Sequence, residues 1–229
     1  MKIQNAIALV TGSNRGIGLA LIKELQARGA KKIYAAARDP KSIDLPGVTP
    51  VKLDVTNPAD VAEAARIAKD ANLVINNAGV ATTTPILAPG AIDAMRAEYE
   101  TNVFGLLNVS RAFAPTLANG ALVNVLSVAS WSTLSILATY ASSKSAAWSV
   151  TNALRHELHD QHTTVSGVHV GFVDTDLTSK LDAPKLSPAV VAKAIVDGIE
   201  RGDEEIIVDD FSRMVHDGLS QSAYLRPRA

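Results

Sequence analysis

The regular alternation of short apolar runs with longer segments of helical periodicity constrains the fold of this chain most. Several apolar runs lack alternating polar residues, which is typical of parallel strands covered on both faces. The predicted strands are residues 6–11, 32–37, 49–53, 73–76, 121–126, 164–170 and 205–208. The predicted helices are residues 17–28, 58–70, 92–117, 140–159 and 188–200. This order predicts a doubly wound α/β fold, a parallel sheet of about seven strands with helices on both faces.

Composition bounds the class of protein. The 229 residues suit one domain, 1–229, and a hydrophobic content of 47% is enough to form a sizeable core. The 22 basic and 23 acidic residues leave a net charge of −1, so nothing in the charge points to a nucleic-acid partner. No cysteine is present, which excludes disulfides and thiol catalysis. No apolar run approaches the ~20 residues of a membrane span, and we expect a cytoplasmic protein without a membrane partner.

A glycine-rich turn lies where the first predicted strand meets the first predicted helix. Gly12, Gly16 and Gly18 have the spacing G-x-x-x-G-x-G, which differs from the common G-x-G-x-x-G fingerprint. Such a turn lets the backbone approach a pyrophosphate, and the helix N-terminus offers unpaired N–H groups to it. A tight strand–helix turn without a ligand would look similar. Because this turn opens a βαβ unit, it favours a Rossmann-like dinucleotide site.

The end of the second predicted strand bears on the choice of dinucleotide. An NAD-binding site commonly has a carboxylate there to accept the ribose hydroxyls. Here Ala37 occupies that position and Arg38 follows it, while Arg15 lies in the glycine turn. Two arginines near the ribose suit a 2′-phosphate, which predicts NADP(H), although both could be solvated surface charges. Asp39 is the competing feature, because it could reach the ribose itself or pair with Arg38.

Tyr140 and Lys144 are four residues apart, so they lie on one face of a helix, one turn from each other. A free tyrosine has a pKa near ~10, and a nearby cation lowers this value. A tyrosine tuned in this way can exchange a proton with an alcohol or carbonyl. Ser127, thirteen residues before Tyr140, is a second hydroxyl that can be directed at a developing alkoxide. Together with the dinucleotide turn, this set predicts hydride transfer.

These residues resemble the short-chain dehydrogenase/reductase family in its shorter, single-domain form. The resemblance ends near residues 171–175 and is carried by motifs in the family's order and spacing: residues 11–18, Asp54-Val55, Asn76-Asn77-Ala78-Gly79, Asn102, Ser127, Tyr140 and Lys144. Each motif alone is common, but the set is specific to the family. The resemblance implies an NADP(H)-dependent oxidoreductase that interconverts a small-molecule carbonyl compound and its alcohol.

The resemblance also implies roles for individual residues. Tyr140 would be the general acid in reduction, Ser127 would orient the substrate oxygen, and Lys144 would hold the nicotinamide ribose. Asn102 would hold a water that links Lys144 to solvent. The remaining cofactor contacts would come from Gly12, Ser13, Asn14, Arg15, Gly16, Ile17, Gly18, Arg38, Asp54, Val55, Asn77, Ala78, Gly79, Val173 and Thr175.

The family resemblance further implies a homotetramer or homodimer built on the helices predicted at 92–117 and 140–159. A face of small residues on the second helix would permit close approach: Ala141, Ser145, Ala146 and Ser149. The chain departs from the family where Val170 replaces the usual proline before Gly171. Residues 176–187, which would cover the substrate, are few enough to form only a small lid.

Several alternatives stay open on the sequence alone. An NAD(H)-dependent alcohol dehydrogenase and a non-catalytic nucleotide sensor share this fold, although the intact Ser127, Tyr140 and Lys144 argue against the sensor. A dehalogenase-like lyase would lose the glycine turn and replace the lysine with arginine. An epimerase of the extended family would need a larger C-terminal substrate region.

Some individual residues also allow two interpretations. Ser130 and Ser132 compete with Ser127 for its role. Four apolar residues line a substrate pocket or simply pack the loop: Trp131, Leu134, Ile136 and Leu137. The spacing of His156, His159 and His162 lacks the i, i+4 pair of a zinc motif, which favours a solvated helix end and no metal. The sequence Arg226-Pro227-Arg228-Ala229 is expected to form a loose chain end.

Overall fold

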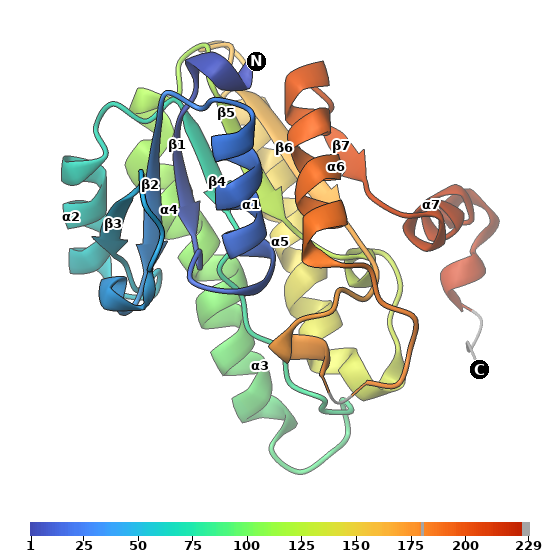
Figure 1. Ribbon diagram of the computed structural model, residues 1–229. Coiled ribbons are helices and arrows are strands. Elements are labelled where there is room, and N and C mark those ends of the chain that lie inside the picture. Colours follow the sequence, from blue (N-terminus) through green and yellow to red (C-terminus); the bar gives the residue numbers. More distant parts are fainter. Residues whose placement is uncertain (180, 226–229) are drawn as a thin grey trace.

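The computed structural model describes residues 1–179 and 181–225, so the expected loose end at 226–229 lies outside the described residues. Seven parallel strands form one sheet in the order β3-β2-β1-β4-β5-β6-β7 (Figure 1). The strands are β1 (Ile7–Thr11), β2 (Lys32–Ala37), β3 (Thr49–Lys52), β4 (Leu73–Asn76), β5 (Ala121–Val125), β6 (Thr164–His169) and β7 (Glu205–Ile207). Every predicted strand is present, and no boundary differs from its prediction by more than one residue. The predicted fold class is confirmed.

Helices cover both faces of the sheet, as Figure 1 shows. On one face lie α1 (Gly16–Ala27) and α6 (Pro188–Arg201), whose buried aliphatic side chains pack against one side of the strands. On the other lie α2 (Pro58–Ile67), α4 (Leu106–Phe113) and α5 (Ala138–Glu157), which form a second core with the opposite side of the same strands. Because the strands are buried on both faces, their apolar runs are continuous rather than alternating. In the described part of the chain, no helix is both long and apolar enough to span a membrane.

The strand order reverses between β1 and β4, which both pair with their neighbours in parallel register. β1 leads through α1 to β2 on one side, while β4 leads away to β5 on the other. Ligands of such sheets bind in the crevice outside the carboxyl ends of the strands at this switch point. The residues that follow β1, β4, β5 and β6 therefore meet at one edge of the sheet.

The single helix predicted at 92–117 is wrong in detail. It is divided into α3 (Ala91–Tyr99), a π-helical segment (Glu100–Gly105), α4 and a 3₁₀ turn (Ala114–Thr116). A Cβ atom at Gly105 would lie only 2.6 Å from Cγ2 of Val55, so glycine allows the helix to approach the loop after β3. Short π-helical segments occur frequently at functional sites, and this one contains Asn102.

One helix was not predicted from the sequence, namely α7 (Asp210–Asp217), which follows β7. Asp209 caps this helix, since its Oδ1 accepts a hydrogen bond from Ser212 N at 2.7 Å. Its Oδ2 accepts a second bond, from Gly171 N at 2.7 Å. The capping aspartate therefore also ties α7 to the turn after β6. In this turn Val170, the residue before Gly171, takes the place of the family's usual proline.

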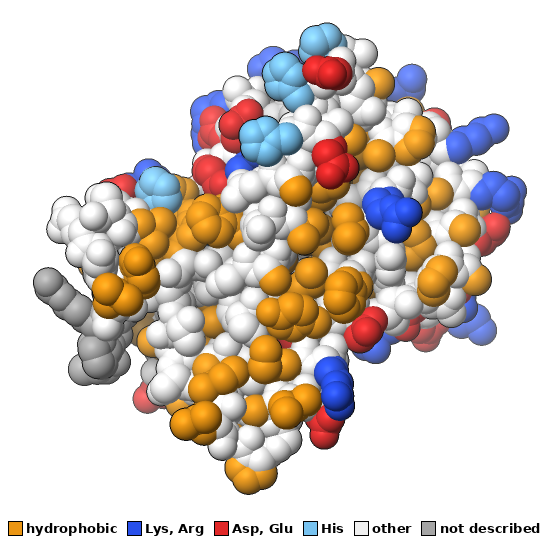
Figure 2. All heavy atoms as spheres, turned by 180° about the vertical axis from the view of Figure 1, so that it is seen from behind, with side chains coloured by type: hydrophobic (Ala, Val, Ile, Leu, Met, Phe, Trp, Pro, Cys, Tyr) orange, Lys and Arg blue, Asp and Glu red, His pale blue; other side chains and the backbone are white. Residues whose placement is uncertain are grey.

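The face seen from behind, where α3, α4 and α5 lie, exposes hydrophobic side chains (Figure 2). Phe104 is 48% exposed there. Of the small-residue face predicted for subunit contact, Ser145 and Ser149 are exposed, whereas Ala141 is fully buried within the chain. Ala141 is therefore unavailable for such a contact, because it faces inward on α5.

Candidate active site

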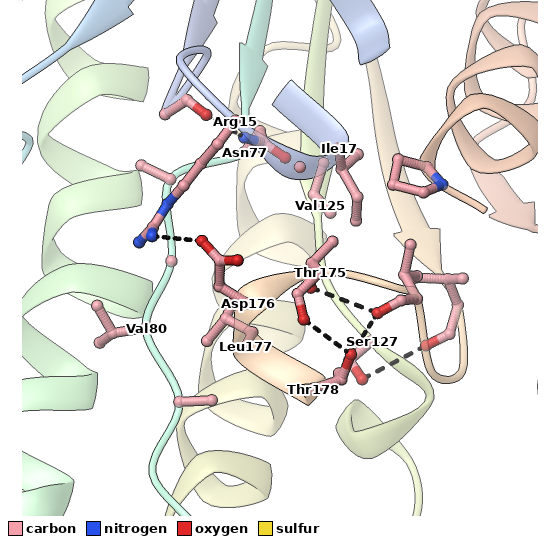
Figure 3. Close-up of a pocket in the computed structure, with 18 of the residues that line it drawn as sticks. Arg15, Ile17, Asn77, Val80, Val125, Ser127, Thr175, Asp176, Leu177 and Thr178 are labelled. Atoms are coloured by element: carbon pink, nitrogen blue, oxygen red, sulfur yellow. Dashed lines mark hydrogen bonds and ion pairs between the residues drawn. The ribbon is translucent and has the colours of Figure 1, made fainter. Parts of the chain in front are cut away.

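A pocket of about 1000 Å³ lies at the carboxyl edge of the sheet (Figure 3). Most of the predicted site residues line it: Gly12, Asn14, Arg15, Gly16, Ile17, Arg38, Asp54, Val55, Asn77, Ala78, Gly79, Ser127, Tyr140, Lys144, Val173 and Thr175. Three predicted residues do not line it, namely Ser13, Gly18 and Asn102. Ser13 is fully buried, and its hydroxyl donates to the backbone oxygen of Ala36 at 3.1 Å. These three residues support the pocket from behind.

The glycine turn is packed against the turn that follows β4. Gly12 has φ +64°, and a Cβ atom there would lie 3.0 Å from Cα of Ala78. A Cβ atom on Gly18 would lie 2.2 Å from the backbone oxygen of Gly12, so this contact requires glycine. The Nδ2 atom of Asn77 donates to the backbone oxygens of Thr11 and Gly12 at 2.9 and 3.1 Å. These contacts hold the two turns together at the switch point.

The N-terminus of α1 opens toward this pocket. Its N-cap residue, Arg15, has an extended backbone and makes no side-chain capping bond. The first N–H groups of a helix lack intrahelical partners, and the helix dipole favours an anion beside them. The arrangement can therefore hold a phosphate group through backbone donors.

The charged residues expected to distinguish the dinucleotides lie at two different places. Arg38 is exposed, and its side chain makes no ion pair or hydrogen bond with any residue in 1–179 or 181–225. Asp39 is engaged locally, because its Oδ1 accepts from Lys41 N at 3.0 Å. Arg15 instead extends across the pocket to Asp176, with 2.6 Å between Nη1 and Oδ2 (Figure 3). Of the two arginines, Arg38 is thus the one at the end of β2, and its side chain is not engaged by any described residue.

Ser127 follows β5 and caps the short 3₁₀ turn Val128–Ser130. Its Oγ accepts a hydrogen bond from Ala129 N at 3.1 Å and donates a long one to the backbone oxygen of Val170 at 3.5 Å. Of the two competing serines, Ser132 lines the pocket, whereas Ser130 is buried and does not.

Tyr140 and Lys144 both come from the first turns of α5. Nζ of Lys144 lies 5.8 Å from the centroid of the Tyr140 ring, as expected for residues one helical turn apart. Lys144 is only 6% exposed, and burial lowers its pKa to about 8. At neutral pH the side chain therefore still carries its positive charge.

The expected direction of the Tyr140 pKa shift is wrong. Burial raises the pKa of Tyr140 to about 12, while a hydrogen bond from Ser127 acts to lower it and the Glu98 carboxylate acts to raise it. The ammonium of Lys144 donates to the backbone oxygen of Val125 at 2.8 Å rather than to the phenol oxygen. Tyr140 is consequently a neutral phenol throughout the ordinary pH range, which is the form that donates a proton.

Asn102 connects three segments beneath the pocket. Its Oδ1 accepts from Val80 N at 2.9 Å, and its Nδ2 donates to the backbone oxygen of Val80 and to Ser143 Oγ at 2.8 and 2.9 Å. A Cβ atom on Gly79 would lie 3.2 Å from Oδ1 of Asn102 and 3.8 Å from Nζ of Lys144. Gly79 thus leaves the space that separates the amide from the ammonium.

Glu98 is a functional neighbour that the sequence analysis missed. It is fully buried, and its Oε1 accepts from the backbone N and the hydroxyl of Thr82 at 2.7 and 2.8 Å. Its charge contributes to the raised pKa of Tyr140. Its position four residues before Asn102, on the same helix face, was the only sign of it in the sequence.

Of the four apolar residues in the loop before Tyr140, two line the pocket and two do not. Leu134 and Leu137 line the pocket, whereas Trp131 and Ile136 do not. Trp131 packs instead against His169, and Ile136 is 47% exposed. Further apolar lining that the sequence analysis did not identify comes from Leu177, Leu181 and Phe211.

The segment after β6 closes one side of the pocket. Val173 forms a bridge to Leu186, and a Cβ atom on Gly16 would lie 3.2 Å from Cγ2 of Thr175. Thr175 therefore lies directly opposite the glycine turn. Elsewhere, ring nitrogen Nδ1 of the exposed His159 lies 3.3 Å from Asp160 Oδ1, and residues 1–179 and 181–225 contain no group of three or more metal-ligating side chains.

Comparisons with known proteins agree with this geometry. Residues 6–186 match the family model described as short chain dehydrogenase. An uncharacterized oxidoreductase of Schizosaccharomyces pombe is 32% identical over 197 residues, which cover 78% of both chains. An uncharacterized oxidoreductase of Staphylococcus aureus is 29% identical over 210 residues, covering 85% of this chain and 90% of the relative.

Solved structures of the same architecture are also found. The crystal structure of a short chain dehydrogenase from Burkholderia cenocepacia, in complex with NADP, has a TM-score of 0.95 at 36% identity and covers 100% of both chains. A short chain dehydrogenase/reductase from Burkholderia phymatum, in complex with NAD, shares the fold with a TM-score of 0.85 at 22% identity, covering 100% of this chain and 99% of the other.

Proposed function

The chain belongs to the short-chain dehydrogenase family, and we propose that it is an NADP(H)-dependent oxidoreductase that reduces an uncharged, apolar ketone or aldehyde to its alcohol. The observation that carries this proposal is the convergence of Ser127, Tyr140 and Lys144 in the pocket that contains the glycine turn. These residues supply a hydroxyl donor, a proton donor and a cation at one end of the pocket.

The residues around the pocket fit a nicotinamide dinucleotide. The uncapped N-terminus of α1 suits its pyrophosphate, and the glycine turn leaves room for close backbone approach. Lys144 would hold the ribose next to the nicotinamide, while Val173 and Thr175 would lie at its amide. The cofactor supplies the hydride, and the protein supplies position and proton.

The proton chemistry follows from the protonation states. Tyr140, with its pKa raised to about 12, holds its proton at neutral pH and would donate it to the carbonyl oxygen of the substrate. Ser127 would donate a hydrogen bond to the same oxygen as negative charge develops there. In the reverse direction the same oxygen, once deprotonated, would accept the proton of the alcohol.

The lining near Ser127 and Tyr140 supports an uncharged, apolar substrate. Nine residues from segments 128–137, 177–181 and 211 line this part of the pocket: Val128, Ala129, Ser132, Leu134, Leu137, Leu177, Thr178, Leu181 and Phe211. None of them is charged. A carboxylate or phosphate group on the substrate would lose its hydration there without gaining a charged partner. The desolvation of a buried ion costs roughly several kcal/mol.

The preference for NADP(H) rests on the end of β2. Ala37 offers no carboxylate to the ribose hydroxyls, and Arg38 is exposed and without a partner in the part of the chain that the structure describes. Asp39, the competing ribose ligand, already caps the turn at Lys41. The relative from Burkholderia cenocepacia with NADP in its crystal structure supports the same choice.

The test is a panel of uncharged ketones and aldehydes, each paired with a carboxylated analogue, assayed with NADPH and NADH by the nicotinamide absorbance. We expect turnover of apolar carbonyl compounds with NADPH, and weak or no turnover of the charged analogues. Tight NADPH binding without turnover of any compound would instead support a non-catalytic nucleotide sensor. Equal rates with NADH would contradict the cofactor assignment.

A further inference from the structure

The side chain of His169 lies behind the candidate active site, at the end of β6. It is fully buried and does not line the pocket. Its Nδ1 lies 3.1 Å from the backbone oxygen of Ser127, and its Nε2 lies 2.6 Å from Oε2 of Glu205 on β7. One imidazole therefore links the candidate catalytic serine to a carboxylate two strands away.

The two partners hold this ring from both sides. The backbone oxygen of Ser127 can only accept a hydrogen bond, so Nδ1 must carry a proton. Although burial acts to raise it, the pKa of Glu205 is held below its ordinary value by its contact with His169 and by the nearby charge of Arg155. His169 thus lies between the Ser127 carbonyl and a carboxylate on the neighbouring strand.

A third contact fixes the same ring. Trp131 stacks on His169, with 3.6 Å between ring centroids and 13° between the planes. Because Trp131 follows the 3₁₀ turn that Ser127 caps, the imidazole contacts both ends of that turn, through a carbonyl at one and an indole at the other.

Glu205 is itself anchored by α5. Its Oε1 accepts from Arg155 at 2.9 Å and from Nε1 of Trp148 at 3.3 Å. The charged and titratable groups around His169 are thus Glu205 from β7, Arg155 from α5 and His216 from α7, which lies across Trp131 with 5.0 Å between ring centroids. These contacts therefore connect α5, which carries Tyr140, to the turn that carries Ser127.

We propose that His169, held by Glu205, is a positioning residue that sets the place of the Ser127 hydroxyl relative to Tyr140. The proposal rests on the proposed function, in which both hydroxyls act on one substrate oxygen. Misplacing a catalytic group by about 1 Å can cost roughly a hundredfold in rate, so a buried support of this kind has a kinetic consequence.

The experiment compares three substitutions of one residue. In His169→Asn, the amide nitrogen can replace Nδ1 and keep the bond to Ser127, whereas His169→Gln places its amide near Nε2 and keeps only the contact with Glu205. His169→Leu keeps neither. Ser166→Ala, on the same strand, is the matched control, since it removes a buried hydrogen bond of 2.7 Å to the backbone oxygen of Asp203, far from Ser127.

We expect kcat to fall roughly ten- to a hundredfold in His169→Leu and His169→Gln, and only about threefold in His169→Asn, with unchanged NADPH affinity in all three. All four variants, the control included, should lose thermal stability, but Ser166→Ala should keep its kcat. Equal losses of kcat in the Asn and Leu variants, or a kcat that simply follows stability, would overturn the proposal.

Hydrogen–deuterium exchange gives a readout that does not depend on turnover. The peptide that contains residues 127–134 should exchange faster in His169→Leu than in His169→Asn or the wild type. This result would stand even if no carbonyl compound were reduced, in which case only the proposed function would fail. If His169→Leu does not fold, Glu205→Gln takes its place, and we expect its kcat to fall and its peptide of residues 127–134 to exchange faster than in the wild type, because the imidazole loses its anchor on β7. An unchanged kcat and unchanged exchange would refute the role of the pair.

Discussion

Nζ of Lys144 donates to the backbone oxygen of Val125 at 2.8 Å, so the first turns of α5 are tied to the end of β5 by a buried ammonium. Burial lowers the pKa of this lysine to about 8, from an ordinary value of 10.5. A buried charge with one neutral partner is a cost to folding. The protein thus keeps a destabilising group at the place where the proposed function needs a cation.

Replacing Lys144 with methionine should therefore stabilise the fold while it abolishes activity. Between pH 8 and 10.5 the unfolded chain binds more protons at this lysine than the folded chain does, so wild-type stability gains from this group as pH rises. The variant lacks this dependence. At pH 7 we expect its free energy of unfolding to exceed that of the wild type by about 2 kcal/mol, after allowing for the lost hydrogen bond.

Urea unfolding of Lys144→Met and wild type at several values from pH 7 to 9.5 measures this difference. The advantage of the variant should shrink by up to ~1.4 kcal/mol per pH unit above pH 8. Lys69→Met, which removes an exposed lysine after α2, should show no such trend. A difference that stays constant with pH would mean that Lys144 is not titrating in this range.

Tyr140→Phe should nearly abolish carbonyl reduction while the fold and NADPH binding persist. The variant loses the proton donor but keeps the ring, and general acid catalysis contributes roughly 10²–10⁴-fold. Single-turnover assays with purified protein measure the loss. Tyr99→Phe, which removes a hydroxyl bonded at 3.3 Å to the backbone oxygen of Ser142, is the matched control and should retain activity. Near wild-type turnover in Tyr140→Phe would sink the assignment of the proton donor.

Arg38→Ala should weaken NADPH binding by roughly ten- to a hundredfold and NADH binding much less. A hydrogen bond to a charged group contributes about 1.5–3 kcal/mol, and about 1.4 kcal/mol is tenfold in affinity. Because Arg38 is exposed, salt should reduce the effect. Titration of both cofactors into the wild type, Arg38→Ala and the neighbouring control Lys41→Ala measures it. Equal losses for both cofactors would show that Arg38 does not read the phosphate.

Arg15 should contribute less to this selectivity than Arg38, since it must first leave Asp176. Exposed ion pairs are worth about 0–1 kcal/mol, so the competition is modest. The same titrations with Arg15→Ala test this order. A larger NADPH loss for Arg15→Ala than for Arg38→Ala would reverse it.

We expect the protein to form a homodimer or homotetramer through the exposed faces of the segment from α3 to α4, which contains Phe104, and of α5. Ser145 and Ser149 permit close approach there, and Phe104 offers an apolar contact. Light scattering should give a multiple of the 24.1 kDa chain mass, and Ser149→Arg should reduce it by crowding the helix contact. A wild-type mass of 24.1 kDa at working concentration would count decisively against the assembly.

The sequence by itself determined the sheet and most of the candidate cofactor and catalytic residues that line the pocket. Strands that are buried on both faces need continuous apolar runs, and the glycine turn needs residues without a Cβ. Both features can therefore be predicted from short stretches of the sequence. The contact of 2.2 Å that a Cβ on Gly18 would make with Gly12 shows why the spacing of these glycines could be read directly. Tyr140 and Lys144 were predictable as neighbours because helix geometry fixes residues four apart.

Only the tertiary structure decided the electrostatics and the supports of the site. The pKa of Tyr140 rises rather than falls because burial of the phenol outweighs the hydrogen bond from Ser127, and the Glu98 carboxylate adds to the rise. Asn102, in the π-helical segment, bonds to Val80 from a different part of the chain, and the His169–Glu205 pair joins β6 to β7. Such features arise from contacts between distant residues, which no local pattern records.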